Sequence, residues 1–180
     1  MKYEQQLIKG VYLYEPIVHK DIRGELCKTI HSKSSHLNGD VFQLREEFVT
    51  TSAKNVVRGM HFQIPPFDHE KIIYCVSGAI LDVVLDLRKA SHTYGKIYSV
   101  LLSGDNRRVL WLPKGIAHGF LSLDDRSVVV YKTSIEYSAS HDQGVLWNSI
   151  GFEWPVAEHD VILSERDRKH QALSDFLNPF

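Results

Sequence analysis

Residues 79–88 read AILDVVLDLR. In an extended chain, the hydrophobic side chains of Leu81, Val83 and Leu85 lie on one face, whereas the carboxylate of Asp82 lies on the other. The pattern repeats every two residues, which is typical of a β-strand, whereas a helix repeats every 3.6 residues. The stretch therefore predicts a strand, and it sets the pattern to look for along the rest of the chain.

Similar runs recur on both sides of this strand. They are separated by turn-like stretches that read IPPFDH, VSG, SGDN, PKG and LDDR. Many short strands spaced by turns predict an all-β protein built as an antiparallel sandwich or barrel. The further strands are expected within residues 49–62, 71–76, 96–103, 108–112 and 127–133.

Two segments have a helical pattern instead. Residues 32–40 are expected to hold one helical turn. From Ser164 onward, Leu173, Phe176 and Leu177 recur at helical spacing, and Asn178-Pro179 ends the run. We therefore expect helices near the carboxyl end of an otherwise β protein.

The composition limits the class of protein. A chain of 180 residues suits a single domain, expected over residues 1–180. The formal net charge of −1 gives no global field that favours nucleic acid or a membrane surface. No signal peptide or transmembrane stretch is visible, and Cys27 and Cys75 form no disulfide framework. We expect a soluble cytoplasmic protein with two reduced thiols and with neither nucleic acid nor membrane as a partner.

Two histidine-bearing segments stand out as candidates for chemistry, RGMHFQ at 58–63 and WLPKGIAHGF at 111–120. A buried strand has no need of a guanidinium or an imidazole, so the first segment either ends at the surface or brings chemistry into a cavity. The spacing P-x-G-x-x-H of the second segment resembles the second motif of the cupin superfamily, whose fold is a double-sheet jelly roll. The usual set of cupin metal ligands is incomplete here. His61 and His118 are the obvious donors, and Gln63 stands where the first cupin motif has its second His. No metal site is expected.

A closer resemblance covers most of the chain. VVRGMHFQ, then PP and Lys71, SGAILDVVLDLRKASHTYGK, LWLPKGIAHGFL, VYKT, GFEWP and LSERD follow one another in the order of the dTDP-4-dehydrorhamnose 3,5-epimerase family. The resemblance runs from His19 to about Asp167. It implies a metal-independent cupin jelly roll without a cofactor, a nucleotide-diphosphate 4-keto sugar as substrate, and a homodimer that exchanges its amino-terminal strands. It also implies a place in surface-polysaccharide sugar synthesis.

The implied reaction needs particular groups. Inverting a carbon next to a ketone requires a base on one face, an acid on the other, and a donor or cation for the enolate oxygen. By resemblance, His61 is the base, Asp167 orients it, Tyr131 is the acid and Lys71 stabilises the enolate. A carboxylate on the far nitrogen favours the imidazolium and strengthens the base. Each residue also has an ordinary structural interpretation, and Asp167 could be a helix cap, a catalytic partner or both.

The resemblance also implies residues that bind the substrate. They are Arg58, Gln63, His118 and Tyr137 in the pocket, and Arg23, on an exchanged strand, at the diphosphate. In a straight strand, Arg58 and His61 point to opposite faces. A bulge at Gly59 would turn both side chains toward one cavity.

The sequence departs from the family pattern where the base and sugar are recognised. Lys28 stands where the family has a Glu that touches thymine, and Glu46, Glu47 and Phe48 replace its Q-x-N. Thymidine or guanosine, a hexose or a heptose, and inversion at carbon 3, carbon 5 or both therefore stay open. A non-catalytic nucleotide-sugar binding protein and a metal-dependent cupin enzyme are the alternatives.

Overall fold

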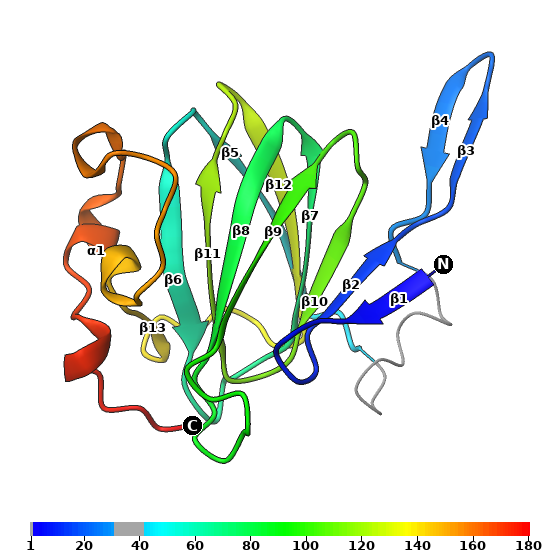
Figure 1. The fold of residues 1–180 in the computed structure, drawn as a ribbon. Coiled ribbons are helices and arrows are strands. Elements are labelled where there is room, and N and C mark those ends of the chain that lie inside the picture. Colours follow the sequence, from blue (N-terminus) through cyan, green and yellow to red (C-terminus); the bar gives the residue numbers. More distant parts are fainter. Residues whose placement is uncertain (1, 31–41) are drawn as a thin grey trace.

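The structure, a computed structural model, describes residues 2–30 and 42–180. Their strands form two antiparallel sheets that face each other, and a separate hairpin (Figure 1). One sheet has the order β1 (Lys2–Gln5), β2 (Tyr12–Glu15), β10 (Val109–Leu112), β7 (Lys71–Ser77), β12 (Ser127–Thr133) and β5 (Glu46–Ser52). The other has the order β13 (Asp142–Gly144), β6 (Val57–Gln63), β11 (Ile116–Ser122), β8 (Ala79–Asp86) and β9 (Ile97–Ser103). The predicted all-β double-sheet fold is confirmed.

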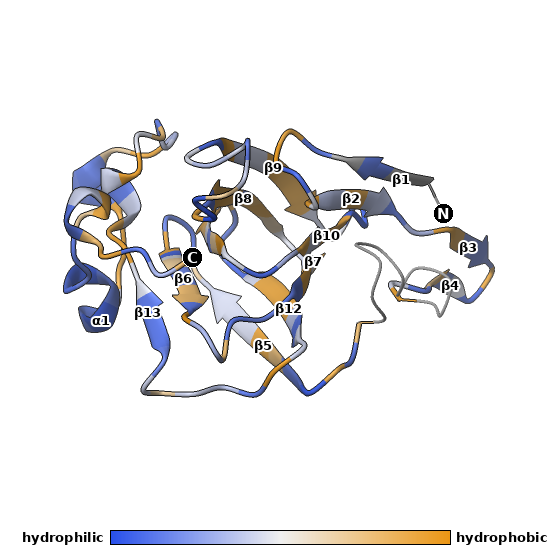
Figure 2. Ribbon diagram, turned by 90° about the horizontal axis from the view of Figure 1, so that it is seen from below, coloured by the Kyte–Doolittle hydropathy of each residue, from blue (hydrophilic) through white to orange (hydrophobic). Residues whose placement is uncertain are grey.

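Strand β8 shows how the sequence pattern positions the interior. Its hydrophobic face, with Val83 and Leu85, packs outward against the carboxy-terminal segment around Phe176. Its other face, with Val84, joins the core between the sheets, and Asp82 on that face is fully buried. Hydrophobic strands therefore lie inside, while hydrophilic residues are frequent in the connecting loops, as Figure 2 shows. The predicted strand carries a carboxylate into the interior.

In the described part of the chain, the helical elements are short and lie beyond the second sheet (Figure 1). They are η3 (Trp147–Ser149), η4 (Glu158–Asp160), α1 (Glu165–Arg168) and η5 (Leu173–Asp175). The single helical run expected from Ser164 is wrong in its length, because the chain leaves the helix after Arg168 and turns again only at Leu173. Only Phe176 of the expected hydrophobic stripe is buried, and Leu177 is almost fully exposed. The turn predicted for residues 32–40 lies outside the described residues.

The run expected over residues 49–62 is two strands, β5 and β6, joined by a turn in which Asn55 has a positive φ of 65°. Strand β11, which carries His118, was missed as a strand because its residues IAHGFLS lack alternation and are all buried. Among the described residues, no helix is long and apolar enough to cross a membrane.

A β-bulge in β6 confirms the prediction made for Gly59. His61 pairs with His118 and Arg58 pairs with Phe120, so two residues of β6 stand opposite Gly119 alone. Gly59 has a φ of 123°, a conformation that side chains rarely allow. A Cβ there would also lie 2.5 Å from the Cα of Gly119. Glycine is therefore required at this position, and the bulge re-aims the residues on either side of it.

Replacing Gly59 with alanine should destabilise the fold by about 3 kcal/mol, because unfavourable φ and a backbone clash add together. Urea unfolding would measure the change. Gly95→Ala is the matched control, since Gly95 also has a positive φ of 73° but its added Cβ would meet no atom within 4 Å. Equal losses in the two variants would show that the close contact with Gly119 does not matter.

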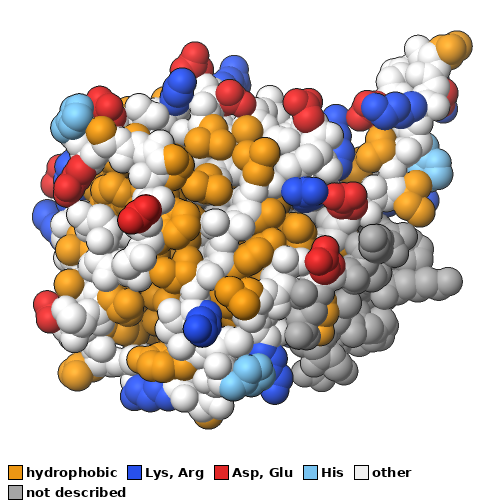
Figure 3. All heavy atoms as spheres, in the orientation of Figure 1, with side chains coloured by type: hydrophobic (Ala, Val, Ile, Leu, Met, Phe, Trp, Pro, Cys, Tyr) orange, Lys and Arg blue, Asp and Glu red, His pale blue; other side chains and the backbone are white. Residues whose placement is uncertain are grey.

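The hairpin of β3 (Val18–Asp21) and β4 (Gly24–Cys27) stands away from both sheets (Figures 1 and 3). Most of its side chains are exposed, including those of Ile22 at its tip and Leu26. Hydrophobic side chains on a projecting hairpin indicate a surface that is covered by something else.

Candidate functional site

A cavity of about 310 Å³ opens between the two sheets. The six-stranded sheet contributes side chains from β5, β7 and β12, and the five-stranded sheet contributes side chains from β6, β11 and β13. Eight of the nine residues predicted for the site are in this chain's cavity or directly behind it. Those that line it are Arg58, His61, Gln63, Lys71, His118, Tyr131 and Tyr137.

His61 and Asp167 form a short contact at the wall of the site. Nε2 of His61 lies 2.6 Å from Oδ1 of Asp167, and the second oxygen of Asp167 accepts the Gly59 N–H at 3.4 Å. Asp167 is only 3% exposed, behind the wall of the cavity. The cap of α1 comes from Ser164, whose Oγ accepts the Asp167 N–H, so the carboxylate itself is turned to His61. Asp167 thus takes part in the start of a helix and in the site at once.

The protonation of this pair follows from its surroundings. Burial alone would raise the pKa of Asp167, but its close contacts with His170 and His61 outweigh it and hold that pKa well below its usual range. Burial lowers the pKa of His61, and Asp167 only partly opposes this effect. The carboxylate favours the imidazolium, as expected, but the cost of desolvation is larger and lowers the pKa of His61 on balance. His61 is neutral at neutral pH.

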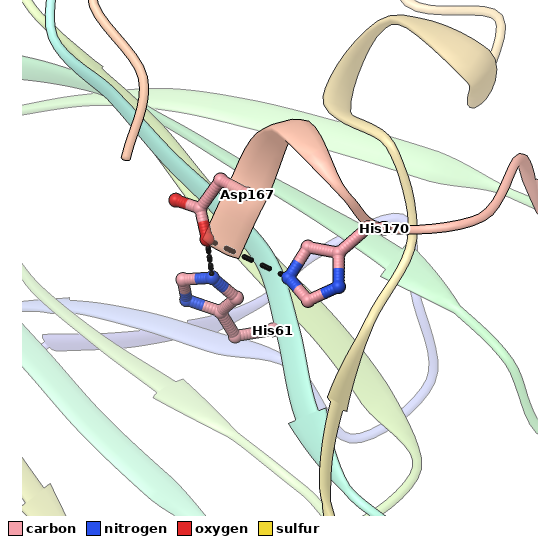
Figure 4. Close-up of side chains that lie close together, drawn as sticks. All are labelled: His61, Asp167 and His170. Atoms are coloured by element: carbon pink, nitrogen blue, oxygen red, sulfur yellow. Dashed lines mark hydrogen bonds and ion pairs between the residues drawn. The ribbon is translucent and has the colours of Figure 1, made fainter. Parts of the chain in front are cut away.

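An ionised carboxylate only accepts hydrogen bonds, so Nε2 of His61 carries the proton. The lone pair is then on Nδ1, on the side of the ring away from Asp167 (Figure 4). A neutral histidine whose tautomer is fixed in this way is equipped to remove a proton.

Lys71, on β7, is close to the same ring. Its Nζ donates to the backbone carbonyl of His61 at 3.2 Å. Burial lowers the pKa of Lys71 to about 8, although the carboxylates of Asp142 and Asp82 favour the charged form. The site therefore holds a partly desolvated cation, which interacts more strongly with a nearby negative charge than a cation in water does.

Tyr131, on β12, lies in the sheet opposite His61. Its ring stacks on Phe48 with centroids 4.7 Å apart, and only 6% of the residue is exposed. Burial, together with the charge of Asp82, raises the pKa of the phenol far above its ordinary value. The hydroxyl therefore keeps its proton across the working range of pH.

His118 forms a second histidine–carboxylate pair. Its Nε2 lies 2.8 Å from Oδ2 of Asp82, and both residues are buried. It stands opposite His61 in the register of β6 and β11, and its ring meets that of Tyr131 edge to face at 5.9 Å. His118 thus connects the two walls of the cavity.

The other predicted residues have distinct environments. The Arg58 guanidinium is held by Ser52 Oγ at 3.0 Å. The amide of Gln63 is committed to the loops around it, since its nitrogen donates to the Phe67 carbonyl at 2.9 Å and its oxygen accepts the Ser138 N–H at 2.6 Å. Gln63 therefore shapes the cavity wall, and its amide is not free for a ligand. Tyr137 is 60% exposed, at the rim.

Arg23 is not in the cavity of its own chain. It follows the β3 strand in the turn of the projecting hairpin, where its guanidinium pairs with Asp21 at 2.6 Å. Its predicted place is at the diphosphate in a second copy of the chain, and this stays a prediction.

Several residues of the site escaped prediction from the sequence. Asp82 and Phe48 are the partners of His118 and Tyr131. Arg166 and Asp142, which form an ion pair at 2.7 Å, also line the cavity. His170 lies beside Asp167, as Figure 4 shows. Asp82 left a signal as a charge in an apolar strand, and Phe48 left one as part of the departure from the family's Q-x-N. Arg166, Asp142 and His170 left none, because their position depends on the tertiary fold.

His61, Asp167 and His170 together offer donor atoms that all lie within 4.8 Å of one another. Two imidazoles and a carboxylate could in principle hold a divalent ion. The 2.6 Å separation of His61 Nε2 and Asp167 Oδ1 is, however, a hydrogen-bond distance, and neighbouring ligands on a tetrahedral zinc lie farther apart. The geometry suits a proton between these two groups.

Comparisons with known proteins agree with this site. A family model described as dTDP-4-dehydrorhamnose 3,5-epimerase matches residues 5–175. The dTDP-4-dehydrorhamnose 3,5-epimerase of Shigella flexneri is 39% identical over 171 residues, which are 93% of each chain. The crystal structure of the enzyme of that name from Bacillus anthracis, with TDP and PPi bound, superposes with a TM-score of 0.90 at 38% identity and covers 96% of this chain and 99% of that chain.

A third relative is ChmJ from Streptomyces bikiniensis, described as a 3'-monoepimerase in complex with dTDP-quinovose. Its TM-score is 0.87 at 30% identity, over 94% of this chain and 86% of that chain. The family model and the identity over nearly the whole chain are decisive. The chain belongs to the dTDP-4-dehydrorhamnose 3,5-epimerase family, and is thus a cupin jelly-roll isomerase that acts on a nucleotide sugar.

Proposed function

We propose that His61 and Tyr131 invert the carbons next to the ketone of a nucleotide-linked 4-keto sugar. The observation that carries the proposal is their placement on opposite sheets of one cavity, with a neutral imidazole on one side and a protonated phenol on the other. A flat enolate held between them would lose a proton to one face and gain a proton on the other.

The step balances without a redox partner. Nδ1 of His61 takes the proton from the carbon next to the ketone. The electron pair of that C–H bond forms the C=C bond of an enolate and leaves a negative charge on the ketone oxygen. The Lys71 ammonium stabilises this charge. The Tyr131 hydroxyl then protonates the opposite face of the carbon, and exchange with solvent restores the histidine and the phenol to their starting forms.

Thymidine diphosphate is the nucleotide that the relatives support best, since two of them were solved with TDP or a dTDP-sugar. Lys28 and Glu46 depart from the family pattern where base and sugar are recognised, so a different base and a different sugar are also tested. The number of carbons inverted is also part of the test, because ChmJ inverts a single centre on a similar fold.

Solvent exchange is the experiment that tests the function. The protein is incubated in deuterated water with thymidine- and guanosine-linked 4-keto hexoses and heptoses, and proton NMR follows each carbon. Deuterium at carbons 3 and 5 would show a double epimerase, and deuterium at one carbon would show a single-centre enzyme. A folded protein that exchanges no proton in any of these sugars would overturn the proposal in favour of a nucleotide-sugar binding protein.

The pH profile of kcat/KM should be bell-shaped. On the acid side, activity rises with pH as His61 loses its proton. This rise lies below the ordinary histidine pKa of 6.5, because burial lowers the pKa of His61. Activity falls again near pH 8, where Lys71 loses the charge that stabilises the enolate. Tyr131 does not titrate in this range, because its pKa is raised.

Lys71→Met isolates the alkaline limb of that profile. The variant should lose activity on the order of a hundredfold and should no longer show a fall near pH 8. If the variant keeps the same alkaline limb, some other group titrates there and Lys71 is not the enolate's cation.

A homodimer is part of the proposed function. The projecting hairpin exposes Ile22 and Leu26, and its turn carries Arg23, which reaches no cavity in its own chain. Insertion of the hairpin into a second copy would cover these side chains and bring a guanidinium to the substrate diphosphate. Light scattering of the full chain would report the dimer. We also propose a reducing, cytoplasmic location, which the free thiols of Cys27 and Cys75 support.

A further inference from the structure

His170 stands beside the base without an assigned task. Its Nε2 lies 3.5 Å from Oδ1 of Asp167, the oxygen that also contacts His61 at 2.6 Å. The rings of His61 and His170 meet edge to face with centroids 5.6 Å apart (Figure 4). Nε2 of His170 is buried and makes no hydrogen bond of regular geometry among the described residues, so its contact with Asp167 is electrostatic. A buried imidazole nitrogen without another partner is costly, so the contact with Asp167 is the one that accounts for its position.

The backbone is built to admit this ring. Gly144 of β13 stands directly opposite His61 in the sheet. A Cβ on Gly144 would lie 2.5 Å from Nε2 of His170 and 2.7 Å from the backbone carbonyl oxygen of Met60, so only glycine leaves room here for both the ring and strand β6. The chain just after His170 is fixed as well, because the Leu146 N–H donates to the Gln171 carbonyl at 2.9 Å. The position of the ring is thus set from both sides.

We propose that His170 is a positioning residue for the reaction, whose ring shares the Asp167 carboxylate with His61 and so limits the pull of that carboxylate on the base. The inference rests on the proposed function of His61. An N–H donor directed at Oδ1 takes up part of the negative charge that would otherwise favour the imidazolium form of His61. His170 thereby helps to keep His61 unprotonated and ready to accept a proton.

The other charged groups around the pair are accounted for. Lys71 on β7 and Arg166 on α1 both disfavour the imidazolium of His61. Asp142 on β13 pairs with Arg166 at 2.7 Å, and Asp82 on β8 pairs with His118 at 2.8 Å. Arg58, on β6 itself, is held by Ser52. A substitution of His170 leaves all of these groups in place, so a change in the titration of His61 reports on the shared carboxylate.

The test is an NMR titration of the His61 ring in the protein without substrate, for wild type and four variants. His170→Phe keeps a ring but loses the donor, and should raise the midpoint of His61 by about half a pH unit or more. His170→Leu also loses the donor and should move the midpoint in the same direction. His170→Gln retains an N–H donor and should stay near wild type. His159→Gln is the control, since His159 is an exposed residue of η4.

The acid limb of kcat/KM should move upward with the midpoint in His170→Phe. An unchanged or lower midpoint in the folded variant would overturn the proposal, and so would an equal loss of rate at every pH, which would mark His170 as merely structural. If His170→Phe does not fold, by circular dichroism, the midpoint in His170→Leu decides in its place. Because the titration needs no turnover, it stays decisive even if no 4-keto sugar proves to be a substrate and the proposed function fails.

Discussion

His61→Asn should abolish exchange of the substrate's protons with solvent, with a fall in the exchange rate on the order of a thousandfold or more. Asparagine keeps a polar amide near the position of Nδ1, although it is too short to replace Nε2, which contacts Asp167 at 2.6 Å. It has no basic nitrogen, however, so the first step of the reaction has no acceptor. Deuterium incorporation measured by NMR gives the rate of this step directly, and calorimetry gives the affinity for the nucleotide sugar.

Binding of the nucleotide sugar should change little in the same variant, because the base acts on a C–H bond that contributes little to affinity. His159→Asn is a suitable control, since His159 is an exposed histidine that lies outside the cavity. Normal exchange in His61→Asn would remove His61 from the role of base. Loss of binding together with exchange would show instead that the substitution damages the cavity.

The fold could be predicted from the sequence where local pattern and packing agree. The alternation in residues 79–88 identified β8, and Gly59 between Arg58 and His61 identified the bulge. Both are local features, because alternation follows from the geometry of a strand and a bulge requires a residue that tolerates positive φ. The carboxy-terminal helix was over-extended because its spacing of Leu173, Phe176 and Leu177 was not matched by burial of Leu177.

The site was less accessible from the sequence. His61, Lys71 and Tyr131 could be named because they lie in motifs that resemble a known family. Asp142 reaches the site through the pairing of β13 with β6, and His170 reaches it because α1, which His170 follows, packs against β6. The balance between burial and Asp167 at His61 was also not predictable, since it depends on how deeply the folded chain covers the ring.

Tyr131→Phe should separate exchange from inversion. The phenylalanine ring can keep the stacking on Phe48, with centroids 4.7 Å apart in the native protein, so the cavity should hold its shape. His61 still removes the proton and returns it from the same face, which lets deuterium enter without a change of configuration. Net inversion should fall on the order of a hundredfold, because the acid on the opposite face is gone.

The ratio of deuterium incorporation to epimer formed is the quantity to measure, by NMR on the same sample. Wild type should give a ratio near one event per inverted carbon, and Tyr131→Phe a much larger ratio. Tyr94→Phe is the control, since Tyr94 is an exposed tyrosine outside the cavity. If inversion and exchange fall together in Tyr131→Phe, the phenol assists proton removal as well. If neither falls, the second proton comes from another donor that faces the cavity, of which His118, paired with Asp82 and edge to face with Tyr131, is the nearest candidate.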